Sequence, residues 1–172
     1  MMQIAGYFWQ MCLLRAGPES LPSSGFATGF ILFLYLPVAI TVSSMSRPGE
    51  AMGVVLATVF IGVSMQALVT YLLTTFKKQQ QRFLATWAAL LGTNAFMLIV
   101  LLPISQIILN IDEGLLRDFA DSAWWICFGW WLAIAGHIYH RSVGISIIQG
   151  SVITFLTEIM SILITNQLLP AV

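Results

Sequence analysis

Five long apolar runs, separated by short polar connections, fill most of this 172-residue chain. Runs of roughly 20 apolar residues are the length that an α-helix needs to cross a bilayer. Hydrophobic residues make up 59% of the chain and charged residues only 8%, too few to form the polar surface of a soluble domain. The sequence therefore predicts an all-α membrane protein, a polytopic bundle of five transmembrane helices.

The predicted spans belong to a single membrane domain that covers residues 1–172. Five crossings use about 100 residues, which leaves too few for a second domain. Pro37 and Pro103 fall inside two of these spans, where proline kinks a helix. The spans are predicted at about 25–43, 51–76, 83–109, 122–139 and 143–168.

The N-terminal segment, residues 1–16, is too short to cross the membrane. Its apolar residues recur at helical spacing, with polar residues and glycine on the other side, which predicts a short amphipathic helix in the membrane interface. A signal peptide is the alternative, but the basic residue of the segment follows the apolar run instead of preceding it. The apolar face consists of Ile4, Tyr7, Phe8, Met11 and Leu14.

Basic residues are divided unequally between the two predicted sides of the membrane. Because cytoplasmic loops carry an excess of Lys and Arg, the richer side is predicted to be cytoplasmic. The N-terminus is then cytoplasmic and, after five crossings, the C-terminus is external. Five residues lie on the richer side and two on the other: Arg15, Lys77, Lys78, Arg82 and Arg141 against Arg47 and Arg117.

The predicted spans each carry a stripe of small or polar residues, which favours close packing of helices in lipid. The agreement of all five spans predicts a compact bundle. The stripes outside the last span are Gly25 and Gly29; Thr58, Gly62, Gln66, Thr70 and Thr74; Ala85, Ala88, Gly92 and Ala95; and Gly129, Ala133, Gly136 and His140.

The last span carries the most informative polar face, formed by Ser151, Thr154, Glu158, Ser161 and Thr165 at steps of three and four. Glu158 lies about 10 residues, or roughly 15 Å, from the outer end of this span. An ionised carboxylate at that depth is costly, so Glu158 is expected to be protonated, paired or facing water. Its expected hydrogen-bond partner is Gln66, Asn94 or Gln106 from a neighbouring span.

This intramembrane polar site, comprising Glu158, Thr154, Ser161, Gln66 and Asn94, has two interpretations. One is structural: a protonated glutamic acid that locks the bundle through hydrogen bonds. The other is functional: a proton or cation site. The structural interpretation is favoured because no second charge lies inside a span.

Other classes of site find little support in the sequence. His137 and His140 have ligand-like spacing, but a metal site needs three or four ligands, so no metal and no cofactor is predicted. The acidic connection at 110–121 misses the calcium-loop pattern. No serine is placed with a histidine and a carboxylate for nucleophilic catalysis, so no enzyme activity is predicted. A net charge of +0 gives no basic patch for nucleic acid.

The segment Arg15-Ala16-Gly17-Pro18-Glu19-Ser20-Leu21-Pro22-Ser23-Ser24, followed by five spans, resembles the start of bacterial proteins assigned to the Yip family of Ypt-interacting proteins. The resemblance implies a helical membrane protein of the bacterial inner membrane, with a cytoplasmic N-terminus, an external C-terminus and no catalytic site. The motif covers about ten residues, and the long cytoplasmic region of the eukaryotic members has no counterpart in this chain.

Two classes of function follow from these observations. The favoured one is a structural or adaptor protein that binds other membrane proteins, a second copy of itself or lipid through its helix faces. The alternative is a small transporter or an ion- or proton-conducting subunit that works through Glu158. The lipid bilayer is the one partner that both classes share.

Overall fold

The computed structural model describes residues 2–168, and over this range it contains helices and no strands. The all-α prediction is confirmed. The helices are α1 (Met2–Cys12), α2 (Gly25–Ser46), α3 (Met52–Phe76), α4 (Phe83–Asn110), α5 (Leu115–Val143) and α6 (Ile147–Leu168), with short 3₁₀ turns at η1 (Pro18–Ser20) and η2 (Gln80–Arg82).

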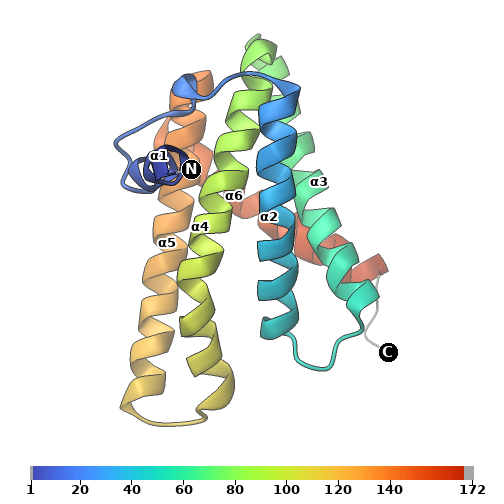
Figure 1. The fold of residues 1–172 in the computed structure, drawn as a ribbon, viewed down its shortest axis with the longest axis vertical. Helices are drawn as coiled ribbons and strands as arrows, with labels where there is room; N and C mark the ends of the chain where they lie inside the picture. Colours follow the sequence, from blue (N-terminus) through green and yellow to red (C-terminus); the bar gives the residue numbers. More distant parts are fainter. Residues whose placement is uncertain (1, 169–172) are drawn as a thin grey trace.

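The helices form an up-and-down bundle with one oblique member (Figure 1). Helices α4 and α5 make a long antiparallel hairpin, and α2 packs along α4. Helix α6 starts beside the end of α5, crosses behind α4 and α2, and reaches α3. The oblique path of α6 leaves its polar face directed toward the centre of the bundle, where residues of all the long helices meet.

Four stretches of the described chain are long and apolar enough to cross a membrane: α2, α3, η2 with α4, and α6. Helix α5 has 29 residues, about 43 Å at 1.5 Å per residue, which is sufficient length for a crossing. Its composition differs from that of the other four stretches, because its tryptophan, histidine and glycine residues make it less apolar. Helices that are long and apolar enough to span a membrane are therefore confirmed, whereas the count of five stays a prediction.

The observed helix bounds differ most from the predicted spans around α5. The helix begins at Leu115, several residues before the predicted start at 122, because Gly114 with φ +117 ends the preceding loop. It also continues through the predicted turn at 140–142. Gly144 then adopts a left-handed φ of +73 and donates its N–H to the His140 carbonyl at 3.0 Å, a common helix ending that suits glycine. Helix α6 accordingly starts at Ile147 instead of 143.

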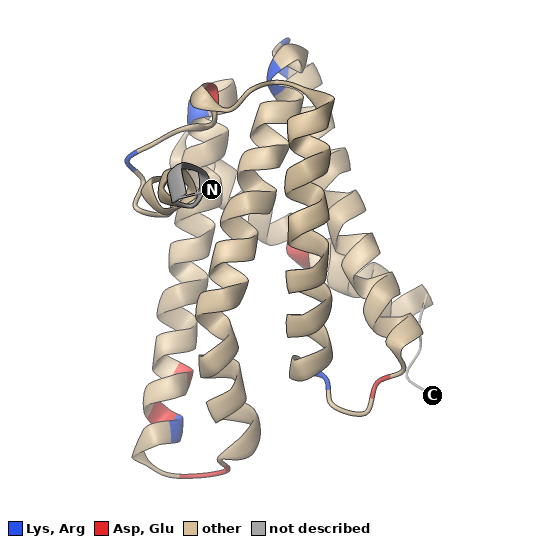
Figure 2. Cartoon of the chain, viewed as in Figure 1, with Lys and Arg blue, Asp and Glu red and all other residues tan. Residues whose placement is uncertain are grey.

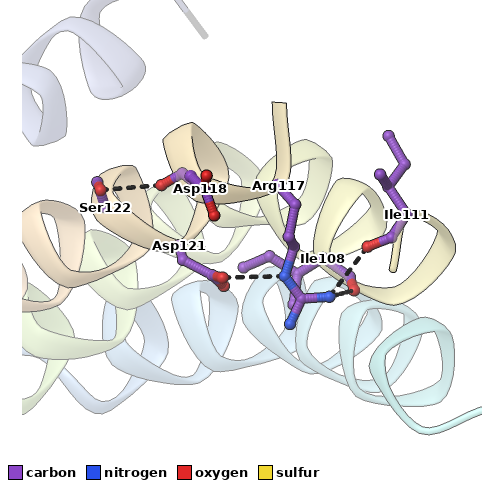
Figure 3. A network of polar contacts seen from close by, with 6 residues as sticks. All are labelled: Ile108, Ile111, Arg117, Asp118, Asp121 and Ser122. Atoms are coloured by element: carbon purple, nitrogen blue, oxygen red, sulfur yellow. Dashed lines mark hydrogen bonds and ion pairs between the residues drawn. The ribbon is translucent and has the colours of Figure 1, made fainter. Parts of the chain in front are cut away.

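The predicted acidic connection at 110–121 is only partly a loop, because α5 already begins at Leu115; the corner between α4 and α5 is held by Arg117 (Figure 3). The Arg117 guanidinium donates to the carbonyls of Ile108 and Ile111, the latter at 3.1 Å, and pairs with Asp121 at 2.9 Å. A cation at the last carbonyls of α4 complements the helix dipole. The carboxylate of Asp121 is therefore used in an ion pair within α5.

Helix α1 packs on the α4–α5 hairpin instead of resting only on lipid. Figure 1 shows α1 nearly end-on while α4 and α5 run lengthwise, so α1 lies across the hairpin. Phe8 and Met11 from the predicted lipid-facing side are buried. The Phe8 ring fills the space that a side chain at Gly92 would occupy, and the Trp130 indole donates to the Cys12 carbonyl at 2.8 Å. The helix ends at Cys12 rather than at 16.

Three of the predicted small-residue stripes have a glycine at a close helix contact, and the first of these is Gly92 against Phe8. A Cβ on Gly150 of α6 would lie 2.8 Å from the Gly136 Cα of α5. A Cβ on Gly62 of α3 would lie 3.6 Å from the Ser161 hydroxyl of α6. The predicted pair Gly25 and Gly29 behaves differently, because neither has a neighbouring described atom within 4 Å of a Cβ. These two glycines therefore make no close helix contact with the residues that the structure describes.

Charged residues gather at the two ends of the bundle, with one acidic segment halfway between them (Figure 2). The basic end contains the end of α3, the start of α4 and the end of α5. There, the Arg82 side chain donates to the Ser142 carbonyl at 3.1 Å, and Arg141 pairs with Glu19. The opposite end carries Arg47 and the α4–α5 corner. The predicted five-to-two grouping of basic residues is thus present in the fold.

Candidate functional site

A polar cavity of about 200 Å³ lies among the long helices. All five residues of the predicted intramembrane site line it: Glu158, Thr154, Ser161, Gln66 and Asn94. They come from three helices, with Gln66 on α3, Asn94 on α4 and the other three on α6. The structure therefore brings together side chains that the sequence could place only on separate helix faces.

The cavity is elongated along the bundle. Helix α2 and the residue that follows it line the cavity with Tyr35, Ala39, Ser43 and Arg47, which are four residues apart and cover about 18 Å at 1.5 Å per residue. Arg47 follows the last turn of α2, and its side chain is 40% exposed. The cavity thus extends from the middle of the bundle to its surface at the end where α2 finishes.

The inner limit of the cavity is a hydrogen bond between two buried hydroxyl groups. The Tyr139 hydroxyl of α5 and the Thr70 hydroxyl of α3 are 2.9 Å apart, and Thr70 also donates to the Gln66 carbonyl at 2.7 Å. Both residues are almost completely buried. These bonds join α3 to α5 and close the cavity on the side of the basic end.

Asn94 is held in a fixed orientation by its neighbour Trp131. The Trp131 indole donates to the Asn94 Oδ1 atom at 2.7 Å. Because the amide oxygen accepts this bond, the amide nitrogen keeps its two donors for a carboxylate, water or another acceptor in the cavity. Asn94 is therefore oriented by α5 while lining the same cavity as Glu158.

Glu158 itself makes no hydrogen bond or ion pair to any residue between 2 and 168, and it is exposed. One predicted partner lies elsewhere: Gln106 donates to the Met45 carbonyl at 3.3 Å, at the far end of α2. The prediction of Gln106 as a partner is wrong, because the side chain lies about 18 Å along α4 from Asn94. The other two, Gln66 and Asn94, line the cavity without a bond to Glu158.

A second polar group in the cavity also lacks a partner. The Thr165 hydroxyl is buried and has no hydrogen bond to a described residue. Buried polar atoms of this kind are normally satisfied by water or an ion. A cavity of about 200 Å³ is large enough for water, whose share of liquid volume is about 30 Å³ per molecule. The cavity is thus suited to hold water beside Thr165.

Three aromatic residues of the site were not identified from the sequence: Tyr35, Trp131 and Tyr139. Aromatic residues are common in spans and at membrane interfaces, so the residue type alone did not indicate that these three belong to a site. The four-residue spacing from Tyr35 to Arg47 marks one face of α2 and was available in the sequence. Nothing in the spacing indicated that this face lies opposite Glu158.

Neither of the two histidines lines the polar cavity. His140 bonds the Ile145 carbonyl through Nδ1 at 2.7 Å and supports the turn between α5 and α6. Within the described part of the chain, no three histidine, cysteine or acidic side chains come close enough to hold a metal ion.

Comparison with known proteins gives no relative: no family model, no curated protein and no solved structure matches this chain. The integral membrane character therefore rests on the four apolar helices.

Proposed function

We propose that this protein is a small transporter or ion-conducting subunit that takes up a proton or a cation at Glu158. The observation that carries the proposal is the position of Glu158: it lines an elongated polar cavity in the middle of the bundle and has no bonding partner among the described residues. An intramembrane carboxylate facing a cavity is a common feature of proton and ion pathways.

The geometry gives less support to a structural lock. A lock requires hydrogen bonds from Glu158 to neighbouring helices, and none joins it to the described residues. Bonds that join the helices around the cavity include Thr70 with Tyr139, Trp131 with Asn94, and Ser151 of α6 with the Leu132 carbonyl of α5. The adaptor function, the Yip resemblance and the absence of enzyme activity stay predictions from the sequence.

The proposed membrane orientation places the basic end in the cytoplasm, by the five-to-two distribution of Lys and Arg. The cavity would then open toward the external side of a bacterial inner membrane. Reporter fusions after Lys78 and after Arg141 are expected to show cytoplasmic activity, and fusions at Asp112 and at the C-terminus external activity. A cytoplasmic C-terminus would contradict five crossings and indicate that α5 does not span.

Water access to the cavity can be tested with single cysteines and a charged, membrane-impermeant thiol reagent. Ser161→Cys on α6 places a thiol of similar size in the cavity, and it is expected to react. Leu163→Cys, two residues further along, lies outside the cavity lining on an exposed apolar face. That thiol is expected to stay unmodified in proteoliposomes, because a thiol in lipid is not ionised and a charged reagent does not enter lipid.

Both single-cysteine variants are made in a protein that also carries Cys127→Ala, because this native free thiol is partly exposed and would react as well. The other cysteine, Cys12, is buried, and burial raises the pKa of its thiol to about 11. It therefore supplies almost no reactive thiolate near pH 8. Equal modification of the two engineered cysteines, or modification of neither, would overturn the proposal of a water-filled cavity.

A further inference from the structure

A second cavity, of about 230 Å³, adjoins the first and is mainly apolar and aromatic. The two share five lining residues: Tyr35, Asn94, Leu98, Trp131 and Glu158. The second cavity adds Trp124 and Phe128 from α5 and apolar residues from α4. Glu158 thus lies between a polar cavity on one side and an aromatic cavity on the other.

The aromatic wall is a packed cluster on α5. The rings of Trp124 and Phe128 are stacked with centroids 5.4 Å apart, and Phe128 is 5.7 Å from Trp131. Phe155 of α6 contacts Phe128 edge-on at 6.3 Å. Because each ring is supported by the next, the cluster presents aromatic surface that needs little reordering to meet a ligand.

A carboxylate beside several aromatic rings is the usual arrangement for binding an organic cation. The face of an aromatic ring attracts an ammonium group, and the attraction is strongest for tryptophan and when water is excluded. The charge balance agrees: the cavities contain Glu158 and Arg47 as charged residues, and Arg47 pairs with Glu50 at 3.5 Å. One negative charge is therefore left for a ligand.

We infer that the joined cavities bind a singly charged organic cation, with Glu158 as its counter-ion and Tyr35, Trp131 and the α5 rings around its apolar part. The inference rests on the proposed function and names its substrate class. A small inorganic cation would use the oxygen-rich polar cavity and gain nothing from the aromatic one. An apolar cation with one charge uses both, because its charge meets Glu158 while its organic groups contact the rings.

The test is titration of the purified protein in detergent with benzyltrimethylammonium, followed by tryptophan fluorescence and by calorimetry. Saturable binding is expected for the wild type, and benzyl sulfonate of similar shape but opposite charge is expected not to compete. Glu158→Gln is expected to weaken binding by about tenfold or more, as removal of a counter-ion does. Retained affinity in this variant would overturn the inference.

Tyr35 offers a matched pair of variants for the aromatic contribution, because its hydroxyl makes no hydrogen bond to a described residue. Tyr35→Phe keeps the ring and is expected to bind within about twofold of the wild type, whereas Tyr35→Leu is expected to bind about three- to tenfold more weakly. Equal affinities of these two variants would contradict the aromatic wall. Unfolding temperatures of all variants establish that each is folded.

The outcomes separate this inference from the proposed function. If the wild type shows Glu158-dependent proton or sodium flux but does not bind benzyltrimethylammonium, the organic-cation inference fails and the proposed function stands. If neither flux nor binding depends on Glu158, both fail.

Discussion

Proteoliposomes with the Glu158→Gln variant are expected to lose the proton or cation flux of the wild type and fall to the level of empty vesicles. Glutamine has nearly the volume and hydrogen-bonding reach of glutamic acid, but it cannot release a proton or balance a cation. Because Glu158 is the one charged residue inside α6 and lines the cavity, no other group on that helix replaces it. The measurement uses an entrapped pH dye under an imposed potential, repeated with a sodium tracer.

The matched control for this experiment is Glu113→Gln, which removes an exposed acidic charge from the α4–α5 corner and leaves the lining of both cavities unchanged. Its flux is expected to stay within about twofold of the wild type, because a solvent-exposed charge away from the cavity is largely screened. A Glu158→Gln protein with full flux would contradict the proposed function. Full flux in Glu158→Gln together with a large fall in the unfolding temperature of Glu158→Leu, which removes the hydrogen-bonding groups, would instead indicate the structural lock.

Replacement of Gly150 by leucine is expected to separate α5 from α6 and to produce the largest loss of stability of any single change considered. A Cβ at this position would lie 2.8 Å from the Gly136 Cα and 2.9 Å from its carbonyl oxygen. These are backbone atoms of a helix, so they cannot move aside as a flexible side chain would. We expect a cost of about 3 kcal/mol or more, above the usual range for overpacking, measured by unfolding in mild detergent.

Gly129→Leu provides the control on the neighbouring helix α5. Its Cβ would meet no described atom within 4 Å, and leucine has the higher helix propensity, so stability is expected to stay equal or rise by about 0.5–1 kcal/mol. Similar losses for Gly150→Leu and Gly129→Leu would contradict a close α5–α6 contact. Because Thr154 and Glu158 follow Gly150 on α6, the Gly150→Leu variant is also expected to lose flux.

The polar face of α6 could be predicted from the sequence, because it depends on periodicity within one helix. Steps of three and four place Thr154, Glu158 and Ser161 on one side whatever the helix packs against. Their partners could not be predicted in the same way. Asn94 and Gln106 are both polar and lie on the same span, yet Asn94 lines the cavity and Gln106 bonds the end of α2. The tilt and rotation of each helix in the bundle decide this.

The small-residue stripes show the same limit. Gly136, Gly62 and Gly25 all belong to predicted stripes and look alike in sequence, but the first two lie at helix crossings and the third has no neighbour within 4 Å of a Cβ among the described residues. The Phe8 side chain of α1 was predicted to face lipid and instead covers Gly92. In a bilayer, lipid and neighbouring helices are similarly apolar, so hydrophobicity does not tell which surface an apolar side chain contacts.

The sequence by itself determined that the chain suits a lipid bilayer and that its fold is all-helical. It also determined the division of charges between the two ends and the polar face of α6. Each follows from a local property: the length of an apolar run, the need to bond every backbone group in lipid, or the period of a helix. Only the tertiary structure decided that α6 crosses obliquely and that Tyr35, Trp131 and Tyr139 surround the same cavity as Glu158. This arrangement of the helices depends on close contacts between backbones, such as Gly136 with Gly150. Such contacts are set by packing among all the helices at once.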